Sequence, residues 1–362
     1  MTVKQLLERV PADREAEDRA WAVVRAAYGE REHVRVLPRR RLMLAAVAVA
    51  VAAGAAALSP SGRAVVDAVR RTIGISHAAP ALFRLPAPGR VLVSGRGGGT
   101  WVVSPDGSKR QLGSYWQAAW SPHGLFVIAV TSNEIAAIEP SDGSVRWSLA
   151  RPNVAFPRWG GSRTDTRVAY LSDGRLRIVA GDGTGDSAVA ASSRVAPAWR
   201  PGDRRQLAYV ASDGRVVLLG AWRSPRRYAE PRSLVWSPDG TSLLLVTARE
   251  LVLFAPASGR AHALSIRDVT AAAFSRAGQL AVVRRNAVLV FDGEAPRTVF
   301  STRGRLRGLA WSPNGRWLLT ALPAADQWIF VGGRRVLAVS HIASQFGGTP
   351  SLDGWVTGPY PG

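Results

Sequence analysis

The chain of 362 residues contains no cysteine. Disulfide bonds, thiolate metal sites, cysteine nucleophiles and a lipid anchor on cysteine are therefore excluded. Histidine is scarce, and its five occurrences are scattered at His33, His77, His123, His262 and His341. The sequence has neither the H-E-x-x-H spacing of a zinc site nor the G-x-S-x-G turn of a serine hydrolase. We therefore expect no metal, no cofactor and no catalytic residue.

Lysine is almost absent, because only Lys4 and Lys109 occur among the 47 basic residues. The rest are arginine, and with 26 acidic residues they give a formal net charge of +21. Two interpretations of this charge remain open. The excess of arginine reflects the codon bias of GC-rich coding, or the positive charge attracts polyanions such as anionic lipid or an acidic cell-surface polymer. We do not expect nucleic acid to be a partner.

Long uncharged runs are also rare, and the one at residues 42–58 (LMLAAVAVAVAAGAAAL) is just long enough to cross a bilayer core. Arg39, Arg40 and Arg41 precede it, and arginine is twice as frequent in the 20 residues before it as in the 20 after. This bias predicts a single-pass cell-membrane protein with a cytoplasmic N-terminus and an exported C-terminal part. A cleaved signal peptide and a buried helix are the alternatives.

The segments that flank this span are predicted to be helical. In the cytoplasmic tail, residues 1–41, a helix that begins near Asp13 would place Trp21, Val24 and Tyr28 on one face. A lone helix is marginal in water, so this face binds another protein or a membrane surface, or else the tail frays. Residues 59–88 are predicted to form a short juxtamembrane helix and then a tether rich in proline and alanine.

A repeated unit dominates the rest of the sequence. In residues 234–247 (LVWSPDGTSLLLVT), Pro238 presets the φ of a turn and Gly240 tolerates positive φ, so two apolar runs should form a β-hairpin. Related units recur at intervals of 37 to 40 residues. The aromatic residues that mark them are Trp120, Trp159, Trp199, Trp236, Phe274 and Trp311. A period near 40 with strand-turn-strand content predicts propeller blades rather than a helical solenoid.

The number of blades follows from the ends of the repeat region. Six complete copies leave three strands unassigned at residues 90–114 and one first strand at 349–356, where Leu352 takes the place of the aromatic residue. Pairing these fragments would close a seventh blade and remove an exposed sheet edge. We therefore predict an all-β fold over residues 89–362, a β-propeller of seven four-stranded blades, with six blades as the fallback.

The W-S-P-D-G turns support a family resemblance. Residues 90–356 resemble the TolB-like branch of the WD-repeat-type propellers, in which this motif marks each blade. The layout of tail helix, span and propeller also resembles single-pass membrane-anchored propellers of GC-rich bacteria, and that resemblance implies no defined activity. Residues 137–147 (AIEPSDGSVRW) resemble the tryptophan-docking motif of quinoprotein-like propellers, with Glu139 in place of aspartate. This resemblance implies that Trp147 packs between blades, and no quinone follows from it.

Three functions remain open on this basis. We expect a non-enzymatic, membrane-anchored propeller that binds, scaffolds or senses a protein or an anionic cell-envelope ligand, and we expect the propeller to be monomeric. The alternatives are an exported hydrolase or quinoprotein-like enzyme, and a transmembrane regulator whose cytoplasmic helix binds a transcription factor such as a sigma factor.

The sequence also suggests where a ligand would bind. Loops that join the outermost strand of one blade to the innermost strand of the next meet at one mouth of the central channel. These loops carry arginines that could form an anion-binding funnel, namely Arg151, Arg194, Arg232, Arg267, Arg303, Arg305 and Arg307. Arginine is so common in this chain that chance alone would also account for their number.

Overall fold

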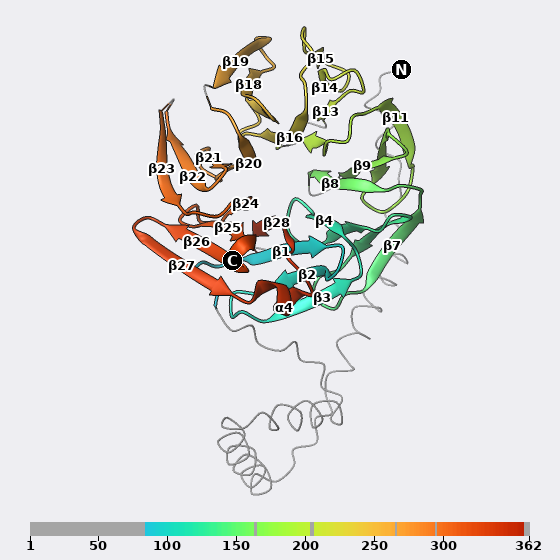
Figure 1. The fold of residues 1–362 in the computed structure, drawn as a ribbon. Helices are drawn as coiled ribbons and strands as arrows, with labels where there is room; N and C mark the ends of the chain where they lie inside the picture. The colour runs from blue at the N-terminus through green and yellow to red at the C-terminus, as the bar shows by residue number, and fades with distance from the viewer. Residues whose placement is uncertain (1–83, 163–164, 203–205, 265, 294, 358–362) are drawn as a thin grey trace, which may run out of the picture. The chain divides into compact units, whose positions relative to one another are not determined.

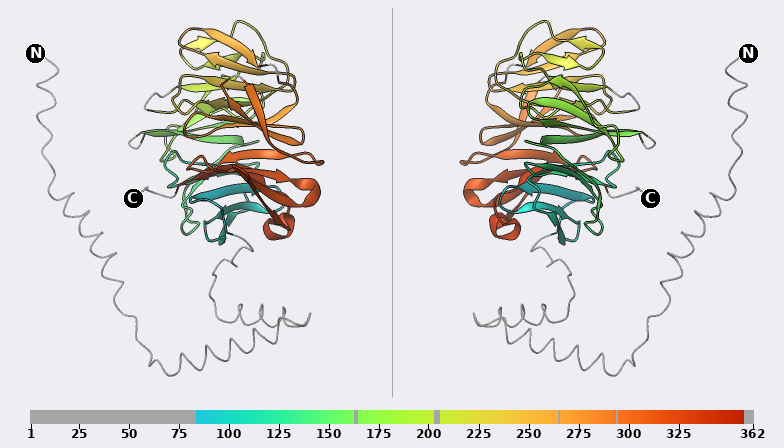
Figure 2. Two further views of the ribbon diagram at one scale, coloured as in Figure 1. Left: turned by 90° about the vertical axis from the view of Figure 1, so that its left-hand side faces the viewer. Right: turned by 90° about the vertical axis from the view of Figure 1, so that its right-hand side faces the viewer.

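The computed structural model describes residues 84–357 except 163–164, 203–205, 265 and 294. These residues form seven antiparallel sheets of four strands each. The sheets are arranged as blades around a central axis; Figure 1 looks onto the ring and Figure 2 shows it from two sides. The structure therefore confirms the all-β, seven-bladed propeller, and the six-bladed fallback is wrong.

Each of the first six blades is built from four consecutive strands, counted from the axis outward. Blade 1 contains β4 (Gln117–Trp120), β5 (Val127–Val130), β6 (Glu134–Ile138) and β7 (Val145–Ala150). Blade 2 contains β8 (Ala155–Gly161), β9 (Thr166–Ser172), β10 (Arg175–Ala180) and β11 (Ser187–Ala191). Blade 3 contains β12 (Ala198–Trp199), β13 (Leu207–Val210), β14 (Val216–Leu218) and β15 (Trp222–Arg223).

The second half of the ring repeats this order. Blade 4 contains β16 (Pro231–Trp236), β17 (Leu243–Thr247), β18 (Leu251–Ala255) and β19 (Arg260–Leu264). Blade 5 contains β20 (Val269–Phe274), β21 (Leu280–Arg284), β22 (Ala287–Asp292) and β23 (Ala295–Ser301). Blade 6 contains β24 (Arg307–Trp311), β25 (Leu318–Leu322), β26 (Gln327–Gly332) and β27 (Arg335–Ser340), with the 3-10 turn η2 (Pro323–Ala325) between β25 and β26.

Blade 7 joins the two ends of the propeller sequence. It contains β28 (Ser351–Val356), β1 (Arg90–Gly95), β2 (Gly99–Val103) and β3 (Lys109–Gly113), in that order from the axis. In Figure 1 the red β28 lies beside the blue-green β1, and the two strands pair antiparallel, with Val91 opposite Trp355. The indole of Trp355 also donates a hydrogen bond to the Pro88 carbonyl at 3.2 Å. The predicted closure of the ring by its terminal strands is therefore confirmed.

The W-S-P-D-G turn forms as its residues require. The Gly240 N–H donates to the Ser237 carbonyl at 2.9 Å, and Gly240 has a φ of +67°, which glycine adopts without strain. The Asp239 carboxylate accepts hydrogen bonds within the turn from the Ser237 hydroxyl and the Thr241 N–H. The next strand, β17, is buried along its whole length, because neighbouring blades cover both faces of the sheet.

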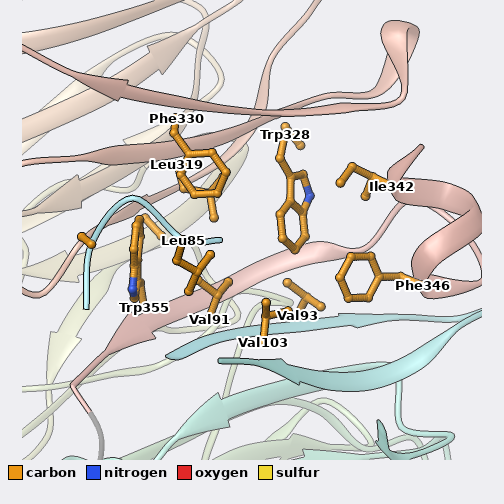
Figure 3. Close-up of a cluster of buried hydrophobic side chains, with 13 residues drawn as sticks. Leu85, Val91, Val93, Val103, Leu319, Trp328, Phe330, Ile342, Phe346 and Trp355 are labelled. Carbon is orange, nitrogen blue, oxygen red and sulfur yellow. The ribbon is translucent and has the colours of Figure 1, made fainter. Parts of the chain in front are cut away.

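Apolar clusters between adjacent blades hold the ring together. Figure 3 shows the cluster at blades 6 and 7, where Trp328 and Phe330 from β26 meet Val91 and Val93 from β1. Phe346, from the short helix α4 (Ile342–Phe346), stacks on Trp328 with ring centroids 5.0 Å apart. Leu85 and Ala87, at the end of the segment predicted as a tether, are also buried in this cluster. The closing blade is therefore packed as well as hydrogen-bonded.

The predicted tail helix within residues 1–41, the span at 42–58 and most of the 59–88 segment lie outside the described residues. Within residues 84–357, no helix is long and apolar enough to cross a membrane.

Candidate functional site

The antiparallel blades give the propeller two different faces. Turns that join the first strand to the second, and the third to the fourth, lie on one side of the ring, which we call the turn face. Connections between blades lie on the other side, which we call the opposite face. The predicted arginine funnel belongs to the opposite face, whereas the S-P-x-G turns belong to the turn face.

A cavity of about 750 Å³ opens on the turn face. Its lining residues come from six of the seven blades, so it must lie on the axis of the ring. Turn prolines form much of its wall, namely Pro122, Pro201, Pro238 and Pro313. Aromatic side chains also line it, namely Phe274, Trp311 and Trp355. The basic side chains are His123 and Arg276, and no carboxylate is among the lining side chains. We call this space the axial cavity.

A second cavity, of about 420 Å³, lies between blades 1 and 2 on the same face. Phe126 and Trp159 stack along it, with ring centroids 5.9 Å apart and an interplanar angle of 20°. Trp147 also lines it and donates an indole hydrogen bond to the Gly181 carbonyl of blade 2 at 2.7 Å. Trp147 thus joins adjacent blades, as the resemblance of residues 137–147 implies. We call this space the aromatic groove.

A third cavity, of about 650 Å³, lies between blades 4 and 5. Pro238, Asp239 and Thr241 from the turn of blade 4 face Phe274 and Arg276 from blade 5 across it. We call this space the blade 4–5 groove.

Two ionisable residues, Asp353 and Arg158, lie on the innermost strands β28 and β8. The pairing of β28 with β1 shifts between Leu92 and Val93, which leaves Asp353 without a partner in the ladder. Such bulges redirect side chains, and Asp353 interacts electrostatically with Arg158 of blade 2 although blade 1 lies between them. Both side chains therefore point to the inside of the ring. Burial raises the pKa of the Asp353 carboxyl to about 7, against the opposing effects of Ser94 and of the Arg158 charge.

Arg158 is positioned by a second bulge, in β8. The register shifts between Ala155 and Arg158, and Phe156 has a φ of +57°, which is strained for a bulky residue. The Phe156 N–H donates to the Gln117 side-chain oxygen of blade 1 at 2.6 Å, which holds this backbone in place. Burial lowers the pKa of the Arg158 guanidinium, and the Asp353 charge offsets part of that effect.

One of the seven predicted funnel arginines is held within blade 2. Arg151 lies 2.6 Å from the Asp186 carboxylate, which also binds Arg177 and Tyr170. Burial raises the pKa of Asp186, but the hydrogen bonds from Arg177, Tyr170 and Arg151 outweigh it, so the pKa lies below its ordinary value. Arg151 is therefore already engaged in an ion pair, in which it shares Asp186 with Arg177.

The other funnel arginines are exposed, namely Arg194, Arg232, Arg267, Arg303, Arg305 and Arg307. Arg232 donates to the Val269 carbonyl at 3.1 Å. Arg194 lines a cavity of about 230 Å³ together with Asp173, and Arg267 lines a different cavity together with Asp268. The structure thus places Arg194 and Arg267 in separate cavities, each beside a carboxylate.

The residues predicted to mark the blades lie along the innermost strands. Trp120 and Trp236 are buried, and the others are partly buried, namely Trp159, Trp199, Phe274, Trp311 and Leu352. Leu352 pairs with Val93 and packs in the cluster between blades 6 and 7.

The sequence predicted that the turn residues are structural, and it did not predict that they also line a cavity. Pro122, Pro238 and Pro313 build the turns and also line the axial cavity. Arg276 stands where the turns of blades 1, 3, 4 and 6 have proline, and this departure from the repeat is the signal that could have marked it. Asp353 could not be found this way, because nothing in the sequence shows the bulge. Within the described residues, no three His, Asp or Glu side chains gather closely enough to hold a metal ion together.

Comparison with known proteins supports the fold. Residues 295–331, from β23 to β26, match the family model described as WD domain, G-beta repeat. No curated protein matches the chain.

Solved structures provide the remaining matches. A functionally unknown protein from Desulfotomaculum acetoxidans DSM 771 is similar with a TM-score of 0.56 and 12% identity, over 76% of this chain and 100% of that chain. A chain of the mitotic checkpoint complex has a TM-score of 0.54 and 16% identity, over 72% and 94%. A putative 6-phosphogluconolactonase from Bacteroides uniformis ATCC 8492 has a TM-score of 0.51 and 15% identity, over 75% and 98%. At such identities the likeness shows the fold alone.

Proposed function

Since the chain is a seven-bladed β-propeller of the WD40 type, we propose that it is a non-enzymatic binding module that holds a protein partner at the axial cavity. The observation that carries the proposal is the composition of that cavity. Turns from five blades and the end of β28 from a sixth converge on it, and the proline rings in four of those turns have a fixed φ, so the surface loses little conformational entropy on binding. Partly exposed aromatic rings, Phe274 and Trp311, are typical anchors of protein interfaces.

We also propose where this module works. The apolar run at residues 42–58 and the arginines before it support a single span with a cytoplasmic N-terminus. The propeller is then held outside the cytoplasm, and the tail of residues 1–41 is free to bind a second protein inside the cell.

A second candidate is an exported enzyme, which Asp353 favours. A carboxyl that titrates near pH 7 suits general acid–base chemistry, and Asp353 lies in the channel. Its Oδ2 atom is buried and makes no hydrogen bond among the described residues, and Asp353 does not line the axial cavity or either groove. Binding at the accessible axial cavity is therefore the better-supported function.

Photo-crosslinking from the cavity tests this proposal. The sequence has no cysteine, so His123→Cys in the full-length chain carries a benzophenone maleimide at one site only. His123 is exposed and lines the axial cavity. In an envelope extract we expect one discrete protein adduct that excess unlabelled chain abolishes, and we expect the purified partner to bind the parent chain.

Ser301→Cys is the matched control, since Ser301 is exposed on the outer strand β23. It should give no such adduct. Identical adducts from both positions, or none from His123→Cys, would show that the axial cavity is not the binding site.

A further inference from the structure

The axial cavity and the two grooves share their walls. The residues common to the axial cavity and the aromatic groove are Pro122, His123 and Leu125. The residues common to the axial cavity and the blade 4–5 groove are Pro238, Phe274 and Arg276. The three spaces therefore adjoin one another along the turn face, and together we call them the trough. Its ends lie three blades apart in a ring of seven, close to opposite sides of the turn face.

The shape of the trough favours an extended chain over a compact ligand. An extended polypeptide advances about 3.3 Å per residue and places alternate side chains on opposite sides. Such a segment can lie across the axial cavity and reach both grooves at once, which a small molecule in one cavity cannot do.

Arg276 lies where the axial cavity meets the blade 4–5 groove; the axial cavity has no carboxylate in its lining, whereas the two grooves each have one, Asp182 and Asp239. Arg276 is exposed, and its guanidinium makes no hydrogen bond or ion pair among the described residues. The carboxylate of Asp239, in the adjoining blade 4–5 groove, accepts hydrogen bonds from Ser237 and Thr241, which hold its pKa below the ordinary value and keep it ionised. A ligand carboxylate that lies in the axial cavity would meet the Arg276 guanidinium without a carboxylate of the cavity wall beside it.

The aromatic groove at one end suits a flat apolar side chain. The rings of Phe126 and Trp159 are both partly exposed, and their stacking leaves an aromatic wall of fixed orientation. The hydrogen bond from Trp147 to Gly181 fixes the neighbouring indole. An aromatic side chain that packs against these rings buries apolar area at little cost in entropy.

We infer that the trough binds an extended acidic polypeptide segment, with a carboxylate beside Arg276 and an aromatic side chain in the aromatic groove. This inference rests on the proposed function and names the class of partner for the same site. An acidic polymer without aromatic side chains, or an anionic lipid surface, matches the charge of Arg276 but not the aromatic groove.

Fluorescence anisotropy with the full-length chain tests the inference. The probe is a fluorescein-labelled random copolymer of glutamate and tyrosine, compared with polyglutamate of equal length. We expect the copolymer to bind at least tenfold more tightly than polyglutamate. Arg276→Glu should weaken both by tenfold or more. Phe126→Ala should remove the advantage of the copolymer and leave polyglutamate binding unchanged.

Three controls accompany these variants. Arg260→Glu makes the same charge change on the exposed outer strand β19, and binding should stay within twofold of the parent. If Phe126→Ala does not fold, Arg146→Glu replaces it, because Arg146 is exposed and lines the aromatic groove, and it should weaken copolymer binding. The triple variant R232E/R267E/R307E carries charge reversals on the opposite face and should bind the copolymer better than Arg276→Glu does.

Each contrary result has a definite meaning. If the triple variant loses binding and Arg276→Glu keeps it, the acidic ligand binds on the opposite face and the inference is wrong. It is also wrong if phosphatidylglycerol vesicles bind with the same dependence on Arg276 and Phe126 as the copolymer. If a partner captured at His123→Cys binds the Arg276→Glu variant as tightly as the parent, the proposed function is upheld and this inference is wrong.

Discussion

At the scale of single residues, Asp353 is in surroundings unlike those of an ordinary aspartate. Burial raises its pKa from 3.8 to about 7, against the opposing effects of Ser94 and Arg158. The folded chain therefore keeps this proton up to about pH 7, whereas the unfolded chain releases it near 3.8. Between these values the folded state binds more protons than the unfolded state. Stability must fall as the pH rises through this window and stay level above it.

Asp353→Asn should remove this loss, because the amide keeps the shape of the side chain and does not titrate. We expect the variant to be more stable than the parent at pH 8, on the order of 1 to 3 kcal/mol, and nearly equal to it at pH 4. Urea denaturation at pH 4, 6 and 8 measures this. Asp142→Asn is the control. Hydrogen bonds from Ser144 lower the pKa of the exposed Asp142 carboxyl, so the change in stability relative to the parent at high pH should have the opposite sign. Parallel pH profiles for parent and Asp353→Asn would show that Asp353 is ionised in the folded protein.

At the scale of elements, tryptophan indoles connect the innermost strands of successive blades. Trp199 donates to the Arg158 carbonyl at 3.1 Å, and Trp236 to the Ala198 carbonyl at 3.0 Å. Trp311 donates to the Ala273 carbonyl at 3.1 Å. In each case the acceptor precedes the marker aromatic residue of the preceding blade. The repeated motif therefore specifies contacts between blades as well as the turn within a blade.

Trp236→Ala should destabilise the propeller by about 3 to 5 kcal/mol, because a buried ring is lost between blades 3 and 4. Trp236→Phe keeps most of the buried area and loses the hydrogen bond, so it should cost much less, with about 1 kcal/mol from the bond itself. Thermal denaturation of both variants measures the difference. Equal losses for the two substitutions would mean that the hydrogen bond, and not packing, dominates at this position.

At the scale of the whole molecule, the number and order of the strands could be predicted well, because W-S-P-D-G turns and apolar strands can each be recognised from a few consecutive residues. Pairing of residues 90–114 with 349–356 could also be predicted, since each fragment lacks what the other supplies. The ligand site could not be predicted, because it depends on how turns from five blades and the end of β28 meet. Trp120 and Trp159 illustrate the limit: they carry the motif, yet their buried indole N–H groups make no hydrogen bond among the described residues.

The topology of the whole chain is a separate prediction. Protease added to intact spheroplasts should digest the propeller and leave the tail of residues 1–41 protected, because the arginines before residues 42–58 keep the N-terminus inside. Immunoblots against each end of the chain measure this. Disruption of the membrane with detergent should expose the tail as a control. A propeller that stays intact until detergent is added would place it inside the cell and reverse the proposed orientation.

The closing blade has a consequence for the order of events during synthesis. Strands β1 to β3 leave the ribosome first, but β28, which covers the edge of β1, is made last, and the bond from Trp355 to Pro88 spans 267 residues. Until then the edge of β1 is free to pair with another nascent chain. Contacts of such long sequence separation form slowly, so closure is the final and slowest step of folding. A ribosome that stalls before residue 351 would release six complete blades and an open ring.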